Sequence, residues 1–214
     1  MPAVNISILK RAALSLGFFV AVYAPAFACV ALVRPQVTVV ISLIIFVSAA
    51  MACLIIVVRA RDAGGIAAFG IRRSPHVYLA AAAVAGVPIG LVLAWLTARY
   101  PAPTPLDLSK LRPWMIFVFF VLAAPVQEEL IFRGLLQTTI ARGAQSAALW
   151  AKHFPVVFVA ALFGLVHLEG GALVAAGAVL LGLIAGELRR MSGSLAPAIL
   201  FHALLNGARA LWSS

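Results

Sequence analysis

Three long apolar runs decide what this chain can fold into. Residues 12–33, 37–58 and 77–98 each exceed the roughly 20 apolar residues that an α-helix needs to cross a bilayer. Inside hydrocarbon, every backbone polar group must find its partner within the protein, so such runs form helices. The chain is 64% hydrophobic and 10% charged, whereas a soluble domain is about one quarter charged. We therefore expect an all-α, polytopic membrane bundle.

The rest of the chain adds four further apolar segments, which makes about seven spans, with six or eight as alternatives. These segments are 114–141, 154–168, 171–188 and 194–212. The first of them is longer than a straight crossing requires, so we expect it to tilt or to project from the membrane. The next two are short and are joined at Gly170 and Gly171. Short, broken spans are tolerated where they line a cavity enclosed by protein.

The beginning of the chain has two possible interpretations. Lys10 and Arg11 precede the first apolar run, and the tripeptide at 26–28 resembles a signal-peptide cleavage site. The run continues beyond this point and is long enough to span the membrane, which favours an uncleaved first helix. We expect one structural domain overall, with N-terminal membrane helices at 1–65 and a core at 66–214.

Basic residues gather in the short loops between the apolar segments, a pattern typical of topology signals and of contacts with lipid headgroups. The more basic side holds ten of them: Lys10, Arg11, Arg59, Arg61, Arg72, Arg73, Arg142, Lys152, Arg189 and Arg190. The opposite side holds Arg34, Arg99, Lys110, Arg112 and Arg209. We therefore expect a multi-pass protein of a bacterial inner membrane with a cytoplasmic N-terminus. This placement accounts for the net charge of +10 without nucleic-acid binding.

Two adjacent glutamates, Glu128 and Glu129, interrupt an otherwise apolar segment. A charged side chain at the centre of a membrane helix costs about 2.5–3.5 kcal/mol on insertion scales, and such residues are usually functional. Glu129 and Arg133 are four residues apart, so they share a helix face and can pair. Glu128 is displaced by about 100° around the helix and is free to act as a general base or acid.

Two later segments carry further polar side chains. Phe163 and His167 are four residues apart, so the phenyl ring can pack beside the imidazole and limit its orientation. His202 and Asn206 repeat this spacing, and two convergent donors in a dry site can stabilise an oxyanion. Taken singly, an intramembrane histidine or asparagine usually joins two helices. Their joint occurrence in a chain with so few polar membrane residues favours one shared functional site.

Together these residues form three motifs, EExxxR at 128–133, FxxxH at 163–167 and HxxxN at 202–206. In this order, on three polar-bearing membrane segments, they resemble the CPBP family. This family includes CAAX prenyl endopeptidases of the Ras converting enzyme type and bacteriocin-processing or bacteriocin-immunity membrane proteins. The resemblance covers residues 66–209. It implies an all-helical intramembrane endopeptidase that acts on a membrane-associated peptide or protein.

The resemblance also implies a role for each motif residue. Glu128 and His167 would activate the catalytic water. His202 and Asn206 would line the same cavity and form the oxyanion hole. The supporting residues would be Glu129, Arg133 and Phe163.

The metal requirement is open at this stage, because the family is often labelled metalloprotease. Glu128, His167 and His202 could supply three nitrogen and oxygen ligands to zinc and leave one position for water. The sequence has no HExxH motif, in which one helix supplies two ligands and a base. A glutamate that acts on water with a histidine and an amide needs no metal, so we favour a reaction without a required cofactor.

Two other functions compete with proteolysis. The helices could form a non-hydrolytic membrane scaffold or a bacteriocin-immunity protein. A proton-coupled transporter also uses intramembrane carboxylates and histidines, but the chain lacks a convincing internal repeat. The sequence specifies neither the substrate and its cleavage site, nor prenyl recognition, nor the oligomeric state.

Overall fold

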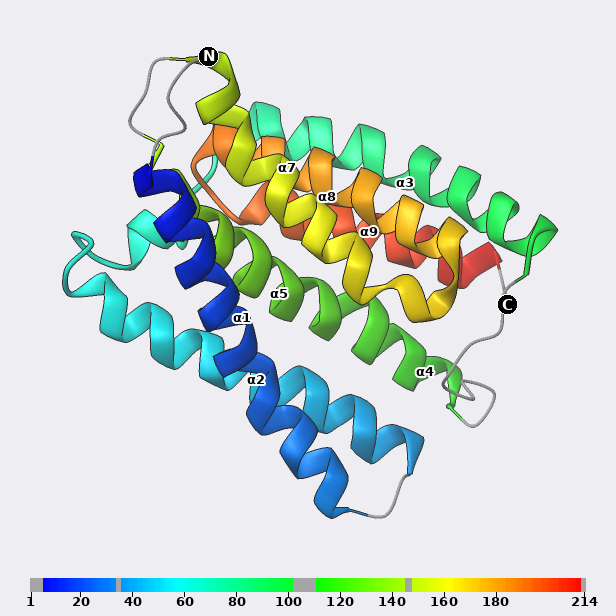
Figure 1. Cartoon of the computed structure of the whole chain (residues 1–214). Coiled ribbons are helices and arrows are strands. Elements are labelled where there is room, and N and C mark those ends of the chain that lie inside the picture. Colours follow the sequence, from blue (N-terminus) through cyan, green and yellow to red (C-terminus); the bar gives the residue numbers. More distant parts are fainter. Residues whose placement is uncertain (1–5, 34–35, 102–110, 145–147, 213–214) are drawn as a thin grey trace.

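All secondary-structure elements in the described residues are helices, and these residues contain no strand (Figure 1). The computed structural model describes residues 6–33, 36–101, 111–144 and 148–212. The long helices outside the glutamate-bearing segment are α1 (Ile6–Leu32), α2 (Val37–Ala60), α3 (His76–Arg99), α7 (Leu149–Val166), α8 (Ala172–Ser192) and α9 (Ala196–Trp212). Two short 3-10 helices, η1 (Ile66–Phe69) and η5 (Leu168–Gly170), lie in the connections. The expected all-α bundle is confirmed.

The glutamates lie on one continuous helical rod, Pro113–Ala141, that changes its winding along its length. Its successive parts are α4 (Pro113–Ile116), η3 (Phe117–Ala123), α5 (Ala124–Glu129), η4 (Leu130–Gln137) and α6 (Thr138–Ala141). η3 and η4 are π-helical. Both glutamates therefore end a short α-helical stretch that has a π-helical segment on either side. π-Helical segments are rare and are frequent at functional sites.

Six helices in the described part of the chain are long and apolar enough to cross a membrane. They are α1, α2, α3, the rod Pro113–Ala141, α7 and α8. The rod has 29 residues and is about 43 Å long at 1.5 Å per residue. This length exceeds the roughly 30 Å of hydrocarbon, as the sequence predicted. α9 coincides with the seventh expected segment but has 17 residues, fewer than the 18 to 29 residues of the other six. The protein is an integral membrane protein.

Glycines bring the helices close together. A Cβ on Gly90 of α3 would lie 2.6 Å from the carbonyl oxygen of Leu205 in α9, and one on Gly86 would lie 3.0 Å from that of Phe201. Gly86 and Gly90 are four residues apart, and this GxxxG pair serves helix packing. Gly182 of α8 likewise approaches Ala160 of α7, where a Cβ would come within 2.8 Å of the Ala160 backbone.

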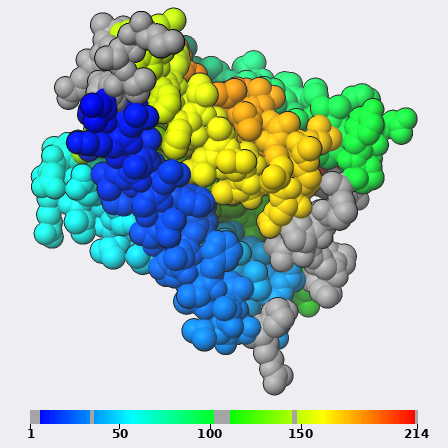
Figure 2. Space-filling view, viewed as in Figure 1, coloured from blue at the N-terminus to red at the C-terminus, as the bar shows by residue number. Residues whose placement is uncertain are grey.

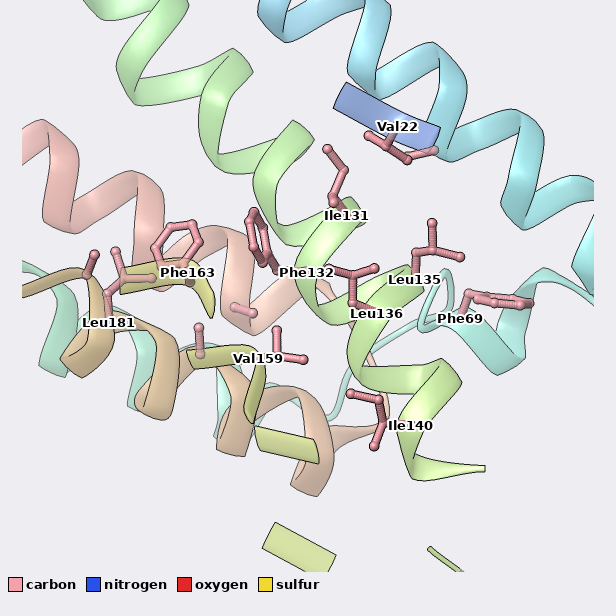
Figure 3. Close-up of a cluster of buried hydrophobic side chains, with 14 of the residues drawn as sticks. Val22, Phe69, Ile131, Phe132, Leu135, Leu136, Ile140, Val159, Phe163 and Leu181 are labelled. Atoms are coloured by element: carbon pink, nitrogen blue, oxygen red, sulfur yellow. The ribbon is translucent and has the colours of Figure 1, made fainter. Parts of the chain in front are cut away.

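The buried core follows the second half of the glutamate-bearing rod (Figure 3). Phe132 and Phe163 meet edge to face at 4.8 Å between ring centroids, which joins η4 to α7. Ile131, Leu135 and Leu136 are fully buried around them. The outer surface is apolar as well, and Figure 2 shows the face on which α1 and α7 lie. Large side chains such as Phe27 and Val157 are more than half exposed there, as expected for contact with lipid.

The bounds of α7 differ from those of the predicted span. The sequence placed this span at 154–168, whereas α7 begins five residues earlier, at Leu149, and ends at Val166. His153 lies inside α7, and its Nδ1 is 2.7 Å from Glu187 Oε1 of α8. His167 directly follows α7, and Gly171 takes a φ of 91° before α8 begins. The expected tight junction at Gly170 and Gly171 is confirmed.

Figure 1 shows which segments share an end of the bundle. The start of α1, the segment between α2 and α3, the end of α6 and the end of α8 lie together. These are segments that the sequence assigned to the more basic side. Arg34 and Lys110, which belong to the opposite count, lie outside the described residues. The cytoplasmic placement of the N-terminus stays a prediction.

Candidate active site

Glu129 and Arg133 form a buried ion pair inside the helical rod. Arg133 Nη1 lies 2.9 Å from Glu129 Oε1, and the two side chains are 1% and 0% exposed. The pairing predicted from their spacing is confirmed. Removing two charges from water is costly, and this contact offsets part of the cost for both.

His202 joins this pair from α9. Its Nδ1 lies 2.9 Å from the same Glu129 Oε1, although the two residues are 73 positions apart in sequence. The ring is brought there because α9 packs against α5 and η3. One carboxylate oxygen of Glu129 thus contacts both the Arg133 guanidinium and the His202 imidazole. Its position is therefore fixed by side chains of the rod and of α9.

Glu128 meets the other side of the same imidazole. Its Oε2 lies 3.6 Å from His202 Nε2. The Glu128 side chain is 19% exposed, whereas that of Glu129 is 0% exposed. The two adjacent glutamates therefore differ, as their positions on the helix suggested. Glu129 is enclosed by protein, and Glu128 is partly exposed.

Phe163 connects the remaining polar residues through its ring. Its centroid lies 4.5 Å from that of His167 and 6.0 Å from that of His202. The Arg133 guanidinium carbon lies 4.8 Å from the Phe163 ring centroid, a cation–π arrangement. The predicted packing of Phe163 beside His167 is confirmed, and the same ring also supports the ion pair.

His167 is held by the backbone of its own helix end. Its Nδ1 lies 2.8 Å from the carbonyl oxygen of Phe163, so that nitrogen carries the hydrogen and donates it. The second ring nitrogen then has its lone pair available. Within the described residues, no hydrogen bond or ion pair joins His167 to Glu128. The two are linked in space through Phe163 and His202.

Asn206 lies one helical turn beyond His202 on α9. Its Nδ2 donates to the carbonyl oxygen of Phe120 at 2.9 Å. Phe120 belongs to the π-helical η3, in which carbonyls depart from the α-helical bonding pattern. Asn206 therefore has one amide hydrogen engaged with the rod, and an amide nitrogen carries two.

A buried polar network beside the site was not predicted. Gln127 Nε2 donates to Tyr23 Oη of α1 at 3.2 Å and to Ser48 Oγ of α2 at 2.9 Å. Gln127 is 3% exposed and directly precedes Glu128. The available sequence signal was a polar amide within an apolar run, next to a glutamate. The network fastens the two N-terminal helices to the α-helical stretch that holds both carboxylates.

The described residues do not fit a zinc site. No group of three His, Cys, Asp or Glu side chains among them is placed to hold a metal ion. The alternative ligand set Glu128, His167 and His202 is not assembled, since His167 packs on Phe163. The Arg133 charge beside Glu129 would also repel a divalent cation. The metalloprotease label thus gains no support, and the metal requirement stays a matter for experiment.

Comparison with known families bears on this site directly. Residues 110–208 match the model of the family described as type II CAAX prenyl endopeptidase Rce1-like. The region that holds the site is therefore similar to this family. The Rce1-like match contains all three motifs, which confirms the resemblance drawn from them, and it supports a protease with a peptide or protein substrate in a membrane. No curated protein and no solved structure matches the chain.

Proposed function

We propose that the protein is an intramembrane endopeptidase of the CAAX type that hydrolyses a peptide bond of a membrane-associated peptide or protein. The observation that carries this proposal is the unequal environment of two adjacent carboxylates around one imidazole. Glu129 is fixed by Arg133 and His202, while Glu128 is partly exposed at the other side of the His202 ring. This arrangement separates a structural carboxylate from one that can react with water.

Glu128 is the general base of the proposed reaction. Its side chain is 19% exposed, so a water molecule can approach it, whereas Glu129 is fully enclosed. A carboxylate within hydrogen-bonding distance of a water can remove a proton as the oxygen attacks a carbonyl carbon. Glu129 does not compete for this role, because its charge is already matched by that of Arg133.

His167 orients the attacking water. Since its Nδ1 donates to the Phe163 carbonyl at 2.8 Å, its Nε2 is the acceptor of the neutral ring. An acceptor at this position can hold one hydrogen of a water while Glu128 removes the other. The ring is kept in place by its packing on Phe163 at 4.5 Å.

His202 and Asn206 form the proposed oxyanion hole. With both ring nitrogens of His202 protonated, the charges of the cluster balance, because two carboxylates then face one guanidinium and one imidazolium. His202 Nε2 would donate to the oxygen that becomes negative, and Asn206 would contribute its second amide hydrogen. Donors fixed in advance in a site of low dielectric stabilise such an oxygen strongly.

The proton balance of the reaction is complete with these residues. Glu128 takes a proton from water, and the hydroxide oxygen forms a bond to the scissile carbonyl carbon. The tetrahedral intermediate then collapses and breaks the bond between carbon and nitrogen. Glu128 returns its proton to the departing amine. No step requires a metal or another cofactor.

The remaining features of the proposal concern the setting of the site. We place the protein in a bacterial inner membrane. Its N-terminus lies on the cytoplasmic side, because the loops on that side carry more basic residues. The substrate reaches the site laterally from the lipid or from the cytoplasmic side. Nucleic acid is not a partner. Whether a prenyl group is recognised is a question for substrates with and without one.

The test uses purified full-length protein in liposomes with a set of farnesylated and unmodified C-terminal peptides. Cleavage products are identified by mass spectrometry. Glu128→Gln keeps the size and polarity of the side chain but removes the base, so we expect a rate 10²- to 10⁴-fold lower, of the order of a general-base contribution. Glu169→Gln is the matched control, because Glu169 is exposed beside His167 and has no part in the proposed reaction.

Three outcomes would overturn all or part of this proposal. Unchanged cleavage by Glu128→Gln would remove Glu128 as the base. Loss of wild-type cleavage in a chelator, with restoration by zinc, would establish a metal enzyme. If wild-type protein cleaves no peptide and Glu128→Ala protein still fulfils the biological role, the non-hydrolytic scaffold or immunity function is correct.

A further inference from the structure

A basic pocket lies at the end of the bundle where α6, α8 and η1 meet. Its volume is about 310 Å³, and it is separate from the carboxylate site. The lining residues are Ala68, Gln137, Thr138, Ala141, Arg142, Arg189 and Arg190. We call it the arginine pocket. The end of α8, which contributes Arg189 and Arg190, lies in Figure 1 at the end of the bundle where α1 starts.

The two inner arginines of this pocket are bound to neutral groups. Arg189 Nη2 donates to the carbonyl oxygen of Ala68 and to Thr138 Oγ1, both at 3.2 Å. Arg142 Nη2 lies 3.4 Å from the carbonyl oxygen of Ala63. In the part of the chain that the structure describes, neither guanidinium forms an ion pair with a carboxylate. These bonds hold the side chains in place but do not neutralise their positive charge.

Arg190, the third arginine of the pocket, differs from Arg142 and Arg189 because it has a carboxylate partner. Arg190 is paired with Glu187 at 2.7 Å, and Glu187 also contacts His153 at 2.7 Å. That carboxylate is therefore already shared and does not serve the inner arginines. Burial lowers the pKa of the Arg142 guanidinium from its usual value, and the nearby charges of Arg11 and Arg59 lower this pKa further, while Asp62 raises it. Positive charge is thus concentrated at this end of the bundle at an energetic cost, which an anion would relieve.

The pocket also offers an acceptor. Gln137 is 5% exposed, and its Nε2 donates to the carbonyl oxygen of Gly186 at 3.0 Å. Its Oε1 is buried without a hydrogen-bond partner. A buried acceptor of this kind is costly when unsatisfied. A ligand that brings a hydroxyl group together with an anionic group would match both parts of the lining.

We propose that the arginine pocket binds the phosphate of an anionic phospholipid headgroup, and that a headgroup hydroxyl donates to Gln137. Guanidinium groups suit phosphate because they donate several hydrogen bonds in a fixed plane. Basic pockets between membrane helices on the cytoplasmic side bind such headgroups. Phosphatidylglycerol combines the required phosphate and hydroxyls and has a net negative charge. Phosphatidylcholine places a cation beside its phosphate and lacks the hydroxyl, so it does not fit.

The experiment measures lipid binding directly and requires no substrate. Full-length protein in detergent is titrated with phosphatidylglycerol, phosphatidylcholine or inorganic phosphate, and bound molecules are counted by native mass spectrometry. We expect phosphatidylglycerol to bind at least tenfold more tightly than the other two. Arg142→Gln should weaken this binding about tenfold, which corresponds to 1.4 kcal/mol. Arg73→Gln, which removes the same charge at an exposed position outside the lining, should change it less than twofold.

A second variant separates the pocket from general folding. Ala141 lines the pocket and is exposed, so Ala141→Glu adds a negative charge to the lining without removing a hydrogen bond or burying the new carboxylate. We expect its thermal unfolding midpoint to be retained and its phosphatidylglycerol binding to fall tenfold or more.

Three results would overturn the proposal. Equal losses with Arg142→Gln and Arg73→Gln would mean diffuse attraction to the basic surface. Equal binding of phosphatidylcholine would exclude headgroup selection. Equal affinity for inorganic phosphate, with displacement of the lipid, would identify a free anion as the occupant. None of these results depends on whether the carboxylate site hydrolyses peptides.

Discussion

Arg133 and Arg189 lie in two polar clusters of the same bundle, and the clusters balance their charges in different ways. Arg133 contacts a carboxylate at 2.9 Å that also holds an imidazole, so its cluster is internally matched. Arg189 is hydrogen-bonded to a carbonyl and a hydroxyl, which position it without neutralising it. A matched cluster stabilises the fold and fixes a geometry. In a cluster whose charges are unmatched, a bound anion can still stabilise the protein.

The burial of the two clusters agrees with this difference. Arg133 is 1% exposed and lies in the middle of the core, between Glu129 and the Phe163 ring. Arg189 and Arg142 line a cavity at an end of the bundle. Removal of a partner should therefore affect folding in the first cluster and binding in the second. The predictions below test this division.

The largest effect is expected for Arg133→Met. This change leaves Glu129 buried with only His202 as its partner, and breaking a buried ion pair on one side costs about 3–5 kcal/mol. The free energy of unfolding in detergent, measured by denaturant titration, should fall by this amount. The double variant Glu129→Gln/Arg133→Met removes both charges and should recover part of the loss. A loss no smaller in the double variant would contradict charge matching as the cause.

An intermediate effect is expected for Phe163→Leu. The shorter side chain loses the ring that supports Arg133, His167 and His202, and we expect a loss of about 1–3 kcal/mol from packing and the cation–π contact. Thermal and denaturant unfolding would measure it. Phe201→Leu on α9 is the matched control, because Phe201 is 0% exposed and Phe163 is 1% exposed. A smaller loss for Phe201→Leu would show that the Phe163 ring acts through its polar neighbours.

The smallest effect on folding is expected for Arg142→Gln. Its guanidinium is bonded to a carbonyl at 3.4 Å, a long contact that a glutamine amide can partly replace. We expect a change within about 0.5 kcal/mol in lipid-free detergent, as is usual away from the core. A loss comparable with that of Arg133→Met, in the same unfolding assay, would show that both clusters serve stability and would remove the distinction between them.

Local features of this arrangement could be predicted from the sequence. The helical bundle followed from the lengths of the apolar runs. The Glu129–Arg133 pair and the packing of Phe163 on His167 followed from four-residue spacing within single helices. The family resemblance also rested on such local motifs, and the matched region contains all of them.

Contacts between helices could not be predicted in the same way. His202 and Glu129 are 73 residues apart, and nothing in either segment specifies that they share an oxygen atom. The Gln127 network with Tyr23 and Ser48 depends on how α1 and α2 cross the rod. The arginine pocket depends on the meeting of two helix ends with η1. Helix crossing angles follow from the whole packing surface, which a motif does not encode.

The π-helical segments on both sides of the glutamates have a consequence for changes in chain length. A π-helical turn closes its hydrogen bonds over one more residue than an α-helical turn, so each segment stores residues that a regular helix would exclude. Deletion of one residue within 130–137 would let the rod relax toward regular winding. Without such relaxation, everything beyond the deletion would turn by about 100° relative to the carboxylates, and relaxation would offset only part of this rotation. The length of this helix thus sets how its polar side chains are rotated toward the neighbouring helices, and insertions or deletions there should be tolerated less than substitutions.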